Sequence, residues 1–374
     1  MYGIDLGTVL LTPVTVGGQD FYVVVDTGSS DPWLVGTGFS CFNPYDGTAE
    51  TEDECYFGPT YDPSNSSTYQ PIPNQNLNLS YADGEIINGL MGYESFSLGG
   101  ITVPQQEFGL VNWAAWNGDG YSSGLVGFAY RTLTSAYAGT NPSADQRGHN
   151  YNYNTLFQSM YASNLTAPVF SIAMSRDPNY AGVLALGGIP DVPISPYFVS
   201  VPIKPVGVNA SSGDIVYEFY TIIIDGFAFS STPNAQFNPY NYPNDLKTTL
   251  SGNGTNSIID SGTSLIYIPD NIASAVNNLF SPPGTYDEDT LTWEVECDAI
   301  PPTFGVSIGQ KVFYVNGGDM ILQNGPSTCI SGVQANLGGL TILGDVWMKS
   351  VLCVFDLGAE MMRFAAREFY GMSW

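Results

Sequence analysis

The sequence is poor in histidine and in basic residues. Its one histidine, His149, lies in a polar stretch, and lysine and arginine together number 9 among 374 residues. A Ser-His-Asp or Cys-His hydrolase would have to depend on that single imidazole. The sequence also lacks the clustered His and Cys residues of a zinc site and the glycine-rich loop with Lys-Ser/Thr of a nucleotide site. We therefore expect neither a metal nor a cofactor.

The charge balance is strongly acidic. Aspartate and glutamate number 35, which gives a formal net charge of −26 at pH 7. Such a surface repels nucleic-acid phosphates and anionic lipids, and its self-repulsion relaxes in acid, where carboxylates protonate. No run approaches the roughly 18 apolar residues that span a membrane, and the closing EFYGMSW is too polar for a lipid-anchor signal. We expect an acidic working range and no nucleic-acid or membrane partner.

The opening MYGIDLG has neither the basic start nor the apolar core of a signal peptide. We therefore take the chain as a mature form from which a signal and a propeptide are absent. At 374 residues it exceeds the size at which single cores stop growing. We expect two lobes, residues 1–192 and 193–374.

One short phrase occurs twice in the sequence. Residues 23–34 read VVVDTGSSDPWL and residues 257–268 read SIIDSGTSLIYI. A strand that stops at Asp-Ser/Thr-Gly presents a carboxylate at its tip, and the glycine allows a tight turn that leaves the carboxylate open. One copy is more often a structural turn than a catalytic one. Two copies in matched apolar contexts predict that Asp26 and Asp260 face one another across a pseudo-dyad.

A second repeat follows the first. Leu125-Val126-Gly127 comes after Asp26, and Ile342-Leu343-Gly344 comes after Asp260. Either phrase alone would be read as an ordinary core strand. Their matched order predicts a duplicated lobe in which each apolar strand packs beside an aspartate turn.

These motifs resemble those of the pepsin-like aspartic endopeptidases, in particular the secreted fungal members. The resemblance also includes Trp33 behind the first aspartate, the YADG phrase at 81–84, and ILGDVW at 342–347 followed by VFD at 354–356. It covers nearly the whole chain. It implies a mainly β, bilobal acid-protease fold, with two pseudo-twofold-related β lobes, a central cleft and a β-hairpin flap.

The resemblance implies hydrolysis of polypeptides in acid by an aspartate dyad and a bound water, without a covalent intermediate. Two close carboxyl groups cannot both ionise, so the pair would share a proton and act as base and acid in one step. Catalysis is expected from Asp26 and Asp260. Support is expected from Thr27, Gly28, Ser29, Ser261, Gly262 and Thr263, with Gly28 and Gly262 donating amides and Ser29 and Thr263 donating hydroxyls.

The family's flap is expected over residues 77–98. Its tip would be Tyr81, Ala82, Asp83 and Gly84, with the Tyr81 hydroxyl reaching the indole N–H of Trp33. Asp83 could pair with a substrate lysine before the cut bond, which would extend a preference for large hydrophobic residues. Trp113, Trp116, Tyr121 and Leu125 are candidates for the pocket wall, with plain core packing as the alternative.

Cysteine usage favours a secreted, extracellular protein. By resemblance we expect the disulfides Cys41–Cys55 and Cys297–Cys329. The apolar stretch VLCVF predicts that Cys353 is a buried free thiol. Asn-x-Ser/Thr sequons at Asn65, Asn78, Asn164, Asn209 and Asn253 permit glycosylation. The resemblance also implies an inhibitory propeptide and sensitivity to pepstatin. A monomer is the default, because a cleft must admit a polypeptide.

Helical periodicity is scarce. We expect short helices at 152–163 and at 270–280, the second with Asp270 as its N-cap and Ala273, Val276 and Leu279 on one face. A catalytically inactive binding or inhibitor protein of the same fold is the alternative function. Such chains typically lose an aspartate or the flap tyrosine, and all three are present here. A glycosidase also uses two carboxylates but does not need the paired turns.

Overall fold

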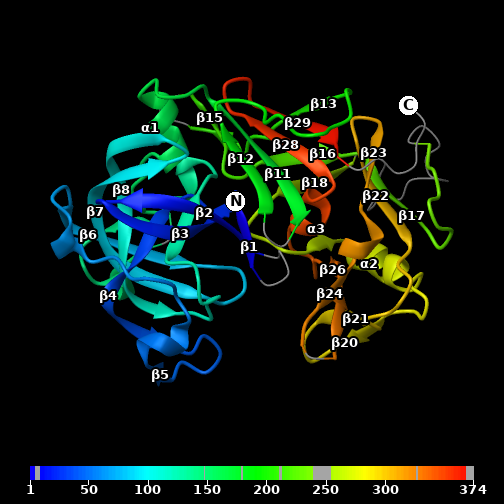
Figure 1. Cartoon of the computed structure of the whole chain (residues 1–374), viewed down its shortest axis with the longest axis horizontal. Coiled ribbons are helices and arrows are strands. Elements are labelled where there is room, and N and C mark those ends of the chain that lie inside the picture. Colours follow the sequence, from blue (N-terminus) through cyan, green and yellow to red (C-terminus); the bar gives the residue numbers. More distant parts are fainter. Residues whose placement is uncertain are drawn as a thin grey trace. The chain divides into compact units, whose positions relative to one another are not determined.

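The protein is described from a computed structural model. The structure describes residues 1–4, 9–146, 148–177, 180–209, 213–238, 254–325 and 327–367. The chain divides into two compact units (Figure 1). Unit 1 comprises residues 1–168, 178–181 and 206–219, and unit 2 comprises 169–177, 182–205 and 220–374. The expected mainly β class is confirmed, with two compact units as the resemblance implies.

Unit 1 is built on one ten-stranded sheet. The strands run in the order β1-β2-β3-β9-β4-β8-β7-β6-β10, with β5 beside β4. Their bounds are β1 Tyr2–Ile4, β2 Val9–Val16, β3 Gln19–Asp26, β4 Pro32–Phe42, β5 Ala49–Glu50, β6 Gln70–Ser80, β7 Ile86–Leu98, β8 Ile101–Ala115, β9 Gly124–Gly127 and β10 Ala136–Ala138. A separate hairpin joins β14 (Gly207–Val208) to β15 (Ile215–Val216).

The described part of unit 2 contains four sheets. Their strand orders are β12-β11-β28-β29-β13, β16-β18-β27-β19-β26, β17-β22-β23 and β20-β21-β25-β24. The bounds are β11 Val169–Asp177, β12 Tyr180–Leu186, β13 Val199–Pro202, β16 Thr221–Ile224, β17 Gly226–Ser230, β18 Thr255–Ile259, β19 Ile266–Ile268, β20 Thr285–Asp287, β21 Thr292–Val295, β22 Thr303–Ile308, β23 Lys311–Tyr314, β24 Ile321–Gln323, β25 Cys329–Ser331, β26 Val333–Ala335, β27 Thr341–Leu343, β28 Val351–Asp356 and β29 Met361–Ala366.

The division of the chain is interleaved rather than one cut at 192/193. Strand β11 follows unit 1 in sequence but pairs antiparallel with β28, and Figure 1 shows the green β11 beside the orange-red β28. Residues 206–219 return to unit 1, where the Tyr217 and Tyr130 rings stack with centroids 5.2 Å apart. Contacts between residues that are distant in sequence therefore determine to which unit each of these segments belongs.

The same three-strand arrangement occurs once in each unit. In unit 1, β9 runs parallel to β3, with Val126 opposite Val25, and antiparallel to β4, with Val126 opposite Pro32. In unit 2, β27 runs parallel to β18, with Leu343 opposite Ile259, and antiparallel to β19, with Leu343 opposite Ile266. Each apolar-apolar-Gly phrase thus packs beside its aspartate turn, as the sequence predicts.

The helices are α1 Leu156–Ala162, α2 Asp270–Asn277 and α3 Asp345–Met348, with 3-10 turns at Glu52–Cys55, Pro63–Asn65, Arg131–Leu133, Pro142–Ala144 and Gly317–Asp319. Helix α1 is shorter than predicted because Thr155 forms a capping box with Gln158. The N-cap predicted for α2 is wrong by one residue. Pro269 occupies it, and the Asp270 carboxylate instead accepts a hydrogen bond from the Leu337 amide.

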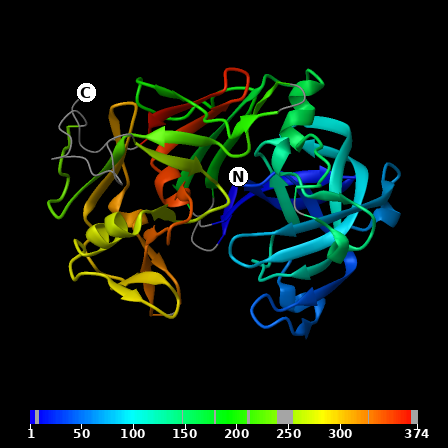
Figure 2. The ribbon, with the colours of Figure 1, turned by 180° about the vertical axis from the view of Figure 1, so that it is seen from behind.

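Helix α2 packs through the face that the sequence predicts, as far as Val276. Ala273 and Val276 are fully buried, whereas Leu279 lies beyond the last helical residue and is half-buried. The Asn277 amide fastens the helix to β26 by donating to the Val333 carbonyl at 2.8 Å, and Figure 2 shows the yellow helix from behind. None of the helices among the described residues is long and apolar enough to cross a membrane.

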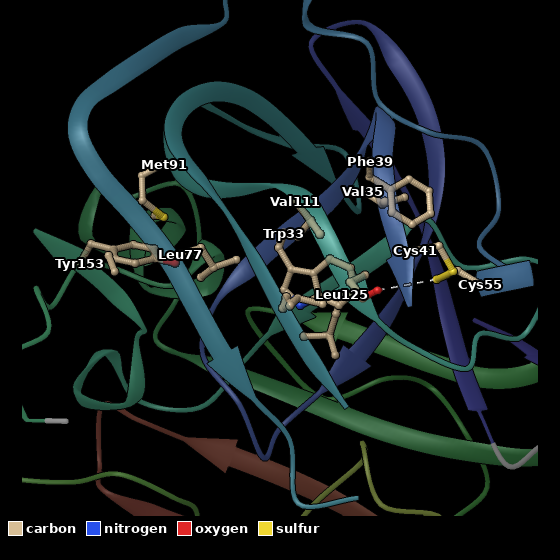
Figure 3. Close-up of a cluster of buried hydrophobic side chains, with 13 residues drawn as sticks. Trp33, Val35, Phe39, Cys41, Cys55, Leu77, Met91, Val111, Leu125 and Tyr153 are labelled. Atoms are coloured by element: carbon tan, nitrogen blue, oxygen red, sulfur yellow. Dashed lines mark hydrogen bonds between the residues drawn. A yellow bond between two sulfur atoms is a disulfide. The ribbon is translucent and has the colours of Figure 1, made fainter. Parts of the chain in front are cut away.

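A cluster of buried, mostly apolar side chains packs together in unit 1. It contains Trp33, Leu125 and Tyr153, and one predicted disulfide, Cys41–Cys55, closes its edge (Figure 3). The second predicted disulfide, Cys297–Cys329, is also present. Cys353 is free and buried, and burial raises the pKa of its thiol. The cysteine pattern expected from the resemblance is therefore confirmed.

Candidate active site

The first aspartate turn is a local hydrogen-bonded cradle. Strand β3 ends at Asp26, whose side chain is 5% exposed. The Gly28 amide donates to Asp26 Oδ1 at 2.7 Å, and the Ser29 hydroxyl donates to Oδ2. Both donors follow within three residues, so the turn sequence itself orients the carboxyl group.

The second turn repeats this geometry at the same offsets. Asp260 directly follows β18 and is 9% exposed. The Gly262 amide donates to Asp260 Oδ1 at 2.9 Å, and Thr263 Oγ1 donates to Oδ2 at 2.7 Å. In both units one backbone donor and one hydroxyl donor therefore fix a carboxyl group at the end of a buried strand.

A glycine at the end of the neighbouring strand, or directly after it, lies against each turn. A Cβ atom on Gly127 would lie 2.4 Å from the carbonyl carbon of Ser30, and one on Gly344 would lie 2.1 Å from the Thr263 oxygen. No side chain fits at these distances, which real Cβ atoms do not show. The glycines of the second sequence repeat thus allow the close approach that holds both turns.

Two predicted support residues stand deeper in the turns. Thr27 is fully buried and Ser261 is 2% exposed. Their predicted role, linking one turn to the other, stays a prediction. Within the described residues no group of three or more His, Cys, Asp or Glu side chains is placed to hold a metal ion.

The flap is a hairpin of β6 and β7 with Tyr81 to Glu85 as its turn. The Tyr81 amide donates to the Glu85 carbonyl at 2.8 Å and closes that turn. Trp33 Nε1 donates to the Tyr81 hydroxyl at 2.8 Å, which is the hydrogen bond expected from the family resemblance. Burial, reinforced by the charge of Asp26, raises the pKa of the Tyr81 phenol, so this hydroxyl stays neutral in acid.

Trp116 joins the flap to the buried cluster. Its ring contacts Tyr81, Trp33 and Phe57, with centroids 5.5, 5.3 and 5.7 Å away. Leu125 is 5% exposed and lies opposite Trp33 in the β4–β9 pair, whereas Tyr121 is 60% exposed. Trp113 packs on Phe42, with centroids 5.1 Å apart. Of the residues predicted to form the pocket wall, Leu125 is therefore a core residue, the two tryptophans are half-buried, and Tyr121 is exposed.

Sequence reasoning missed two carboxyl groups near these elements. Asp31, in the first turn, is fully buried and accepts hydrogen bonds from the Ser135 amide and the Tyr153 hydroxyl. Glu85, at the base of the flap turn, accepts one from the Asn117 amide at 2.9 Å. The only signal in the sequence is proximity to the motifs, because each partner is distant along the chain.

Paired Asp-Ser/Thr-Gly cradles, matched strands behind them and a tyrosine-bearing flap hairpin define the class of aspartic peptidases. The comparisons with known proteins agree. The model of the eukaryotic aspartyl protease family matches residues 10–367, so the chain belongs to that family. It is an aspartic endopeptidase, a hydrolase of the type found in fungi.

Curated relatives of this chain include fungal enzymes. A probable aspartic-type endopeptidase of Aspergillus fumigatus is 39% identical over 373 residues, which cover 96% of this chain and 79% of the relative. Penicillopepsin-1 of Penicillium janthinellum is 26% identical, with 95% of this chain and 94% of the relative covered. The crystal structure of an aspartic proteinase from Irpex lacteus matches in fold, with a TM-score of 0.68, 17% identity, and 98% and 96% of the two chains covered.

Proposed function

We propose that the protein hydrolyses peptide bonds in acid by general acid–base catalysis, with Asp26 and Asp260 as its catalytic residues. A water held by both carboxyl groups would lose a proton to the ionised one and attack the carbonyl carbon. The protonated partner would donate to the carbonyl oxygen, and protons would then pass to the leaving nitrogen. By resemblance Asp260 starts ionised and Asp26 protonated, although a coupled pair titrates as a unit.

The observation that carries this proposal is the repetition of one cradle. Each carboxyl group receives an amide hydrogen bond from the residue two places on and a hydroxyl hydrogen bond from the residue three places on. These donors orient both oxygens of each carboxyl group. A merely structural aspartate turn has no reason to be duplicated together with the strand and glycine behind it.

The test is the substitution of each aspartate by asparagine. Asp26→Asn and Asp260→Asn should each abolish cleavage of denatured haemoglobin at about pH 3.5, because neither variant can share a proton. Asp20→Asn is the matched control, since Asp20 is an exposed residue of the same strand as Asp26. Proteolysis retained in either dyad variant would contradict the mechanism.

We propose that Asp83 adds lysine to a preference for large hydrophobic residues around the cut bond. Asp83 is exposed at the flap tip, where Oδ1 accepts the Glu85 amide at 3.0 Å. Its other oxygen has no partner among the described residues and could bind a substrate ammonium group. Ala82 and Gly84 beside it are also exposed, so the tip is accessible.

Asp83→Ala or Asp83→Thr should reduce cleavage after lysine while cleavage between large apolar residues is kept. A paired peptide set that differs only in lysine or leucine before the cut bond measures this directly. Equal losses for both peptides would show that Asp83 acts on the flap rather than on lysine.

We further propose secretion, an acidic environment, a monomeric state and inhibition by pepstatin-like peptides. Support comes from the two disulfides and from the net charge of −26. Three sequon asparagines, Asn65, Asn164 and Asn209, are exposed. The Asn78 amide donates to Pro142 and Asp145, and Asn253 lies outside the described residues. Haemoglobin digestion with and without pepstatin separates this reading from an inactive binding or inhibitor protein, which would digest nothing.

A further inference from the structure

Glu85 links the base of the flap to the loop that follows β8. Its side-chain Oε1 accepts a hydrogen bond from the backbone N–H of Asn117 at 2.9 Å. Its own backbone closes the flap turn, because its carbonyl accepts the Tyr81 amide and its amide donates to Asp83. One residue therefore both completes the turn and fastens it to a neighbouring segment.

The segment at the other end of this link is itself well held. The Gly118 amide donates to the Cys55 carbonyl at 3.0 Å, and Cys55 is fixed by a disulfide. Asp119 Oδ1 accepts the amides of Tyr121 and Ser122 at 2.7 and 2.6 Å. The loop is thus held in place by its own hydrogen bonds, and Glu85 fastens the flap turn to it.

The electrostatic surroundings of Glu85 disfavour a charge. The side chain is half-buried, and no lysine or arginine among the described residues bonds to it. Asp83 on the flap and Asp119 on the loop add negative charge from both elements that face it. Burial, opposed by the Asn117 hydrogen bond and reinforced by these two aspartates, raises the pKa of Glu85 to about 8.

We propose that Glu85 is a positioning residue of the flap, whose neutral carboxyl group holds the flap turn to Asn117 in acid and whose ionisation releases it. This inference rests on the proposed function and adds a regulatory element to the same site. A carboxyl group with a pKa of about 8 when held and 4.5 when released weakens the held state roughly 300-fold between pH 3 and pH 7. The flap would then close over substrate less readily as the pH rises.

The decisive variant is Glu85→Gln, which keeps the acceptor oxygen but cannot ionise. At about pH 3.5 we expect kcat and KM of this variant to equal those of the wild type, since both side chains are neutral. At about pH 6.5 the variant should have a KM at least about threefold lower than the wild type, with kcat unchanged. Glu85→Ala, which loses the bond at every pH, should raise KM already in acid.

Glu107→Gln is the matched control. Glu107 lies on β8, is half-buried, and also has a pKa raised by burial, but its side-chain partners are Tyr93 and Gln75 rather than the flap turn. Its variant should follow the wild-type KM profile at all pH values. Identical KM profiles for wild type and Glu85→Gln, or an unchanged KM for Glu85→Ala in acid, would overturn the proposal.

A second measurement separates this inference from the proposed function. Hydrogen exchange of the Asn117 amide, corrected for its intrinsic pH dependence, should lose at least about tenfold in protection between pH 4 and pH 7.5 in the wild type but not in Glu85→Gln. This readout needs no catalysis. If the protein cleaved no peptide at all, the exchange data would still decide whether Glu85 holds the flap, and equal protection loss in both proteins would refute it.

Discussion

The buried carboxyl group of Asp31 should make the stability of unit 1 depend on pH. Asp31 has no exposed surface and accepts the Ser135 amide at 2.9 and 3.1 Å and the Tyr153 hydroxyl at 2.5 Å. Burial raises its pKa from the ordinary 3.8 to about 6, although the three hydrogen bonds lower it. The folded protein therefore binds this proton more tightly than the unfolded chain does.

The sign and size of the effect follow from this difference. Between about pH 4 and pH 6 the folded state holds more protons than the unfolded state, so the free energy of unfolding falls as the pH rises. Below this window both states are protonated, and above it both are ionised. A shift of roughly two pKa units corresponds to about 3 kcal/mol lost by pH 7.

Asp31→Asn removes the ionisation while keeping the size of the side chain. Whatever the substitution costs at about pH 3.5, its stability relative to the wild type should improve by about 3 kcal/mol at about pH 7. Groups common to both proteins cancel in this double difference. The measurement is urea-dependent hydrogen exchange of the β4 peptide, which reports on unit 1, in an Asp260→Asn background that prevents autolysis.

A relative change below about 1 kcal/mol would mean that Asp31 ionises almost freely in the fold and that burial does not hold its proton. A change of the opposite sign would mean that its hydrogen bonds outweigh burial.

Three further predictions concern unit 1. Gly127→Ala should destabilise the protein by at least about 2 kcal/mol in thermal unfolding and lower kcat, because the new Cβ must displace the Ser30 backbone 2.4 Å away. Glu94→Gln should destabilise more at about pH 7 than at about pH 3, as denaturation at both pH values will show. Although burial raises the pKa of Glu94, hydrogen bonds from hydroxyl groups and a backbone amide lower it below normal. Replacing Cys41 and Cys55 by serine should cost about 3 kcal/mol in urea unfolding, with matching data for wild type and variant under reducing conditions.

The part of the site that the sequence predicts is the part built from local contacts. The donors to Asp26 lie two and three residues along the chain, so the turn motif specifies them. The Trp33–Tyr81 hydrogen bond spans 48 residues, and only the family resemblance indicated it. Local sequence and resemblance thus account for the cradles and the flap.

What the sequence does not reveal depends on distant partners. Asp31 has the sequence context of an ordinary polar turn residue, and its partners lie far along the chain, at Ser135 and at Tyr153, 122 residues later. Likewise, β11 follows unit 1 along the chain but pairs with β28, nearly the last strand. Burial and strand pairing at such separations are set by the packing of the whole unit, which motif spacing does not report.

The distribution of raised pKa values links stability to the site. Asp31, Glu85 and Glu107 are carboxyl groups whose pKa is raised by burial, and all three belong to unit 1. Each favours the folded unit in its neutral form, so their ionisation weakens unit 1 progressively as the pH rises through their pKa values. Glu94, buried in the same unit, works in the opposite direction because it has more hydrogen-bond donors. Since unit 1 also carries the flap, we expect exchange of its core amides to rise with pH in parallel with the loss of activity, and exchange that stayed constant from about pH 4 to pH 7 while activity fell would assign that loss to the aspartate pair alone.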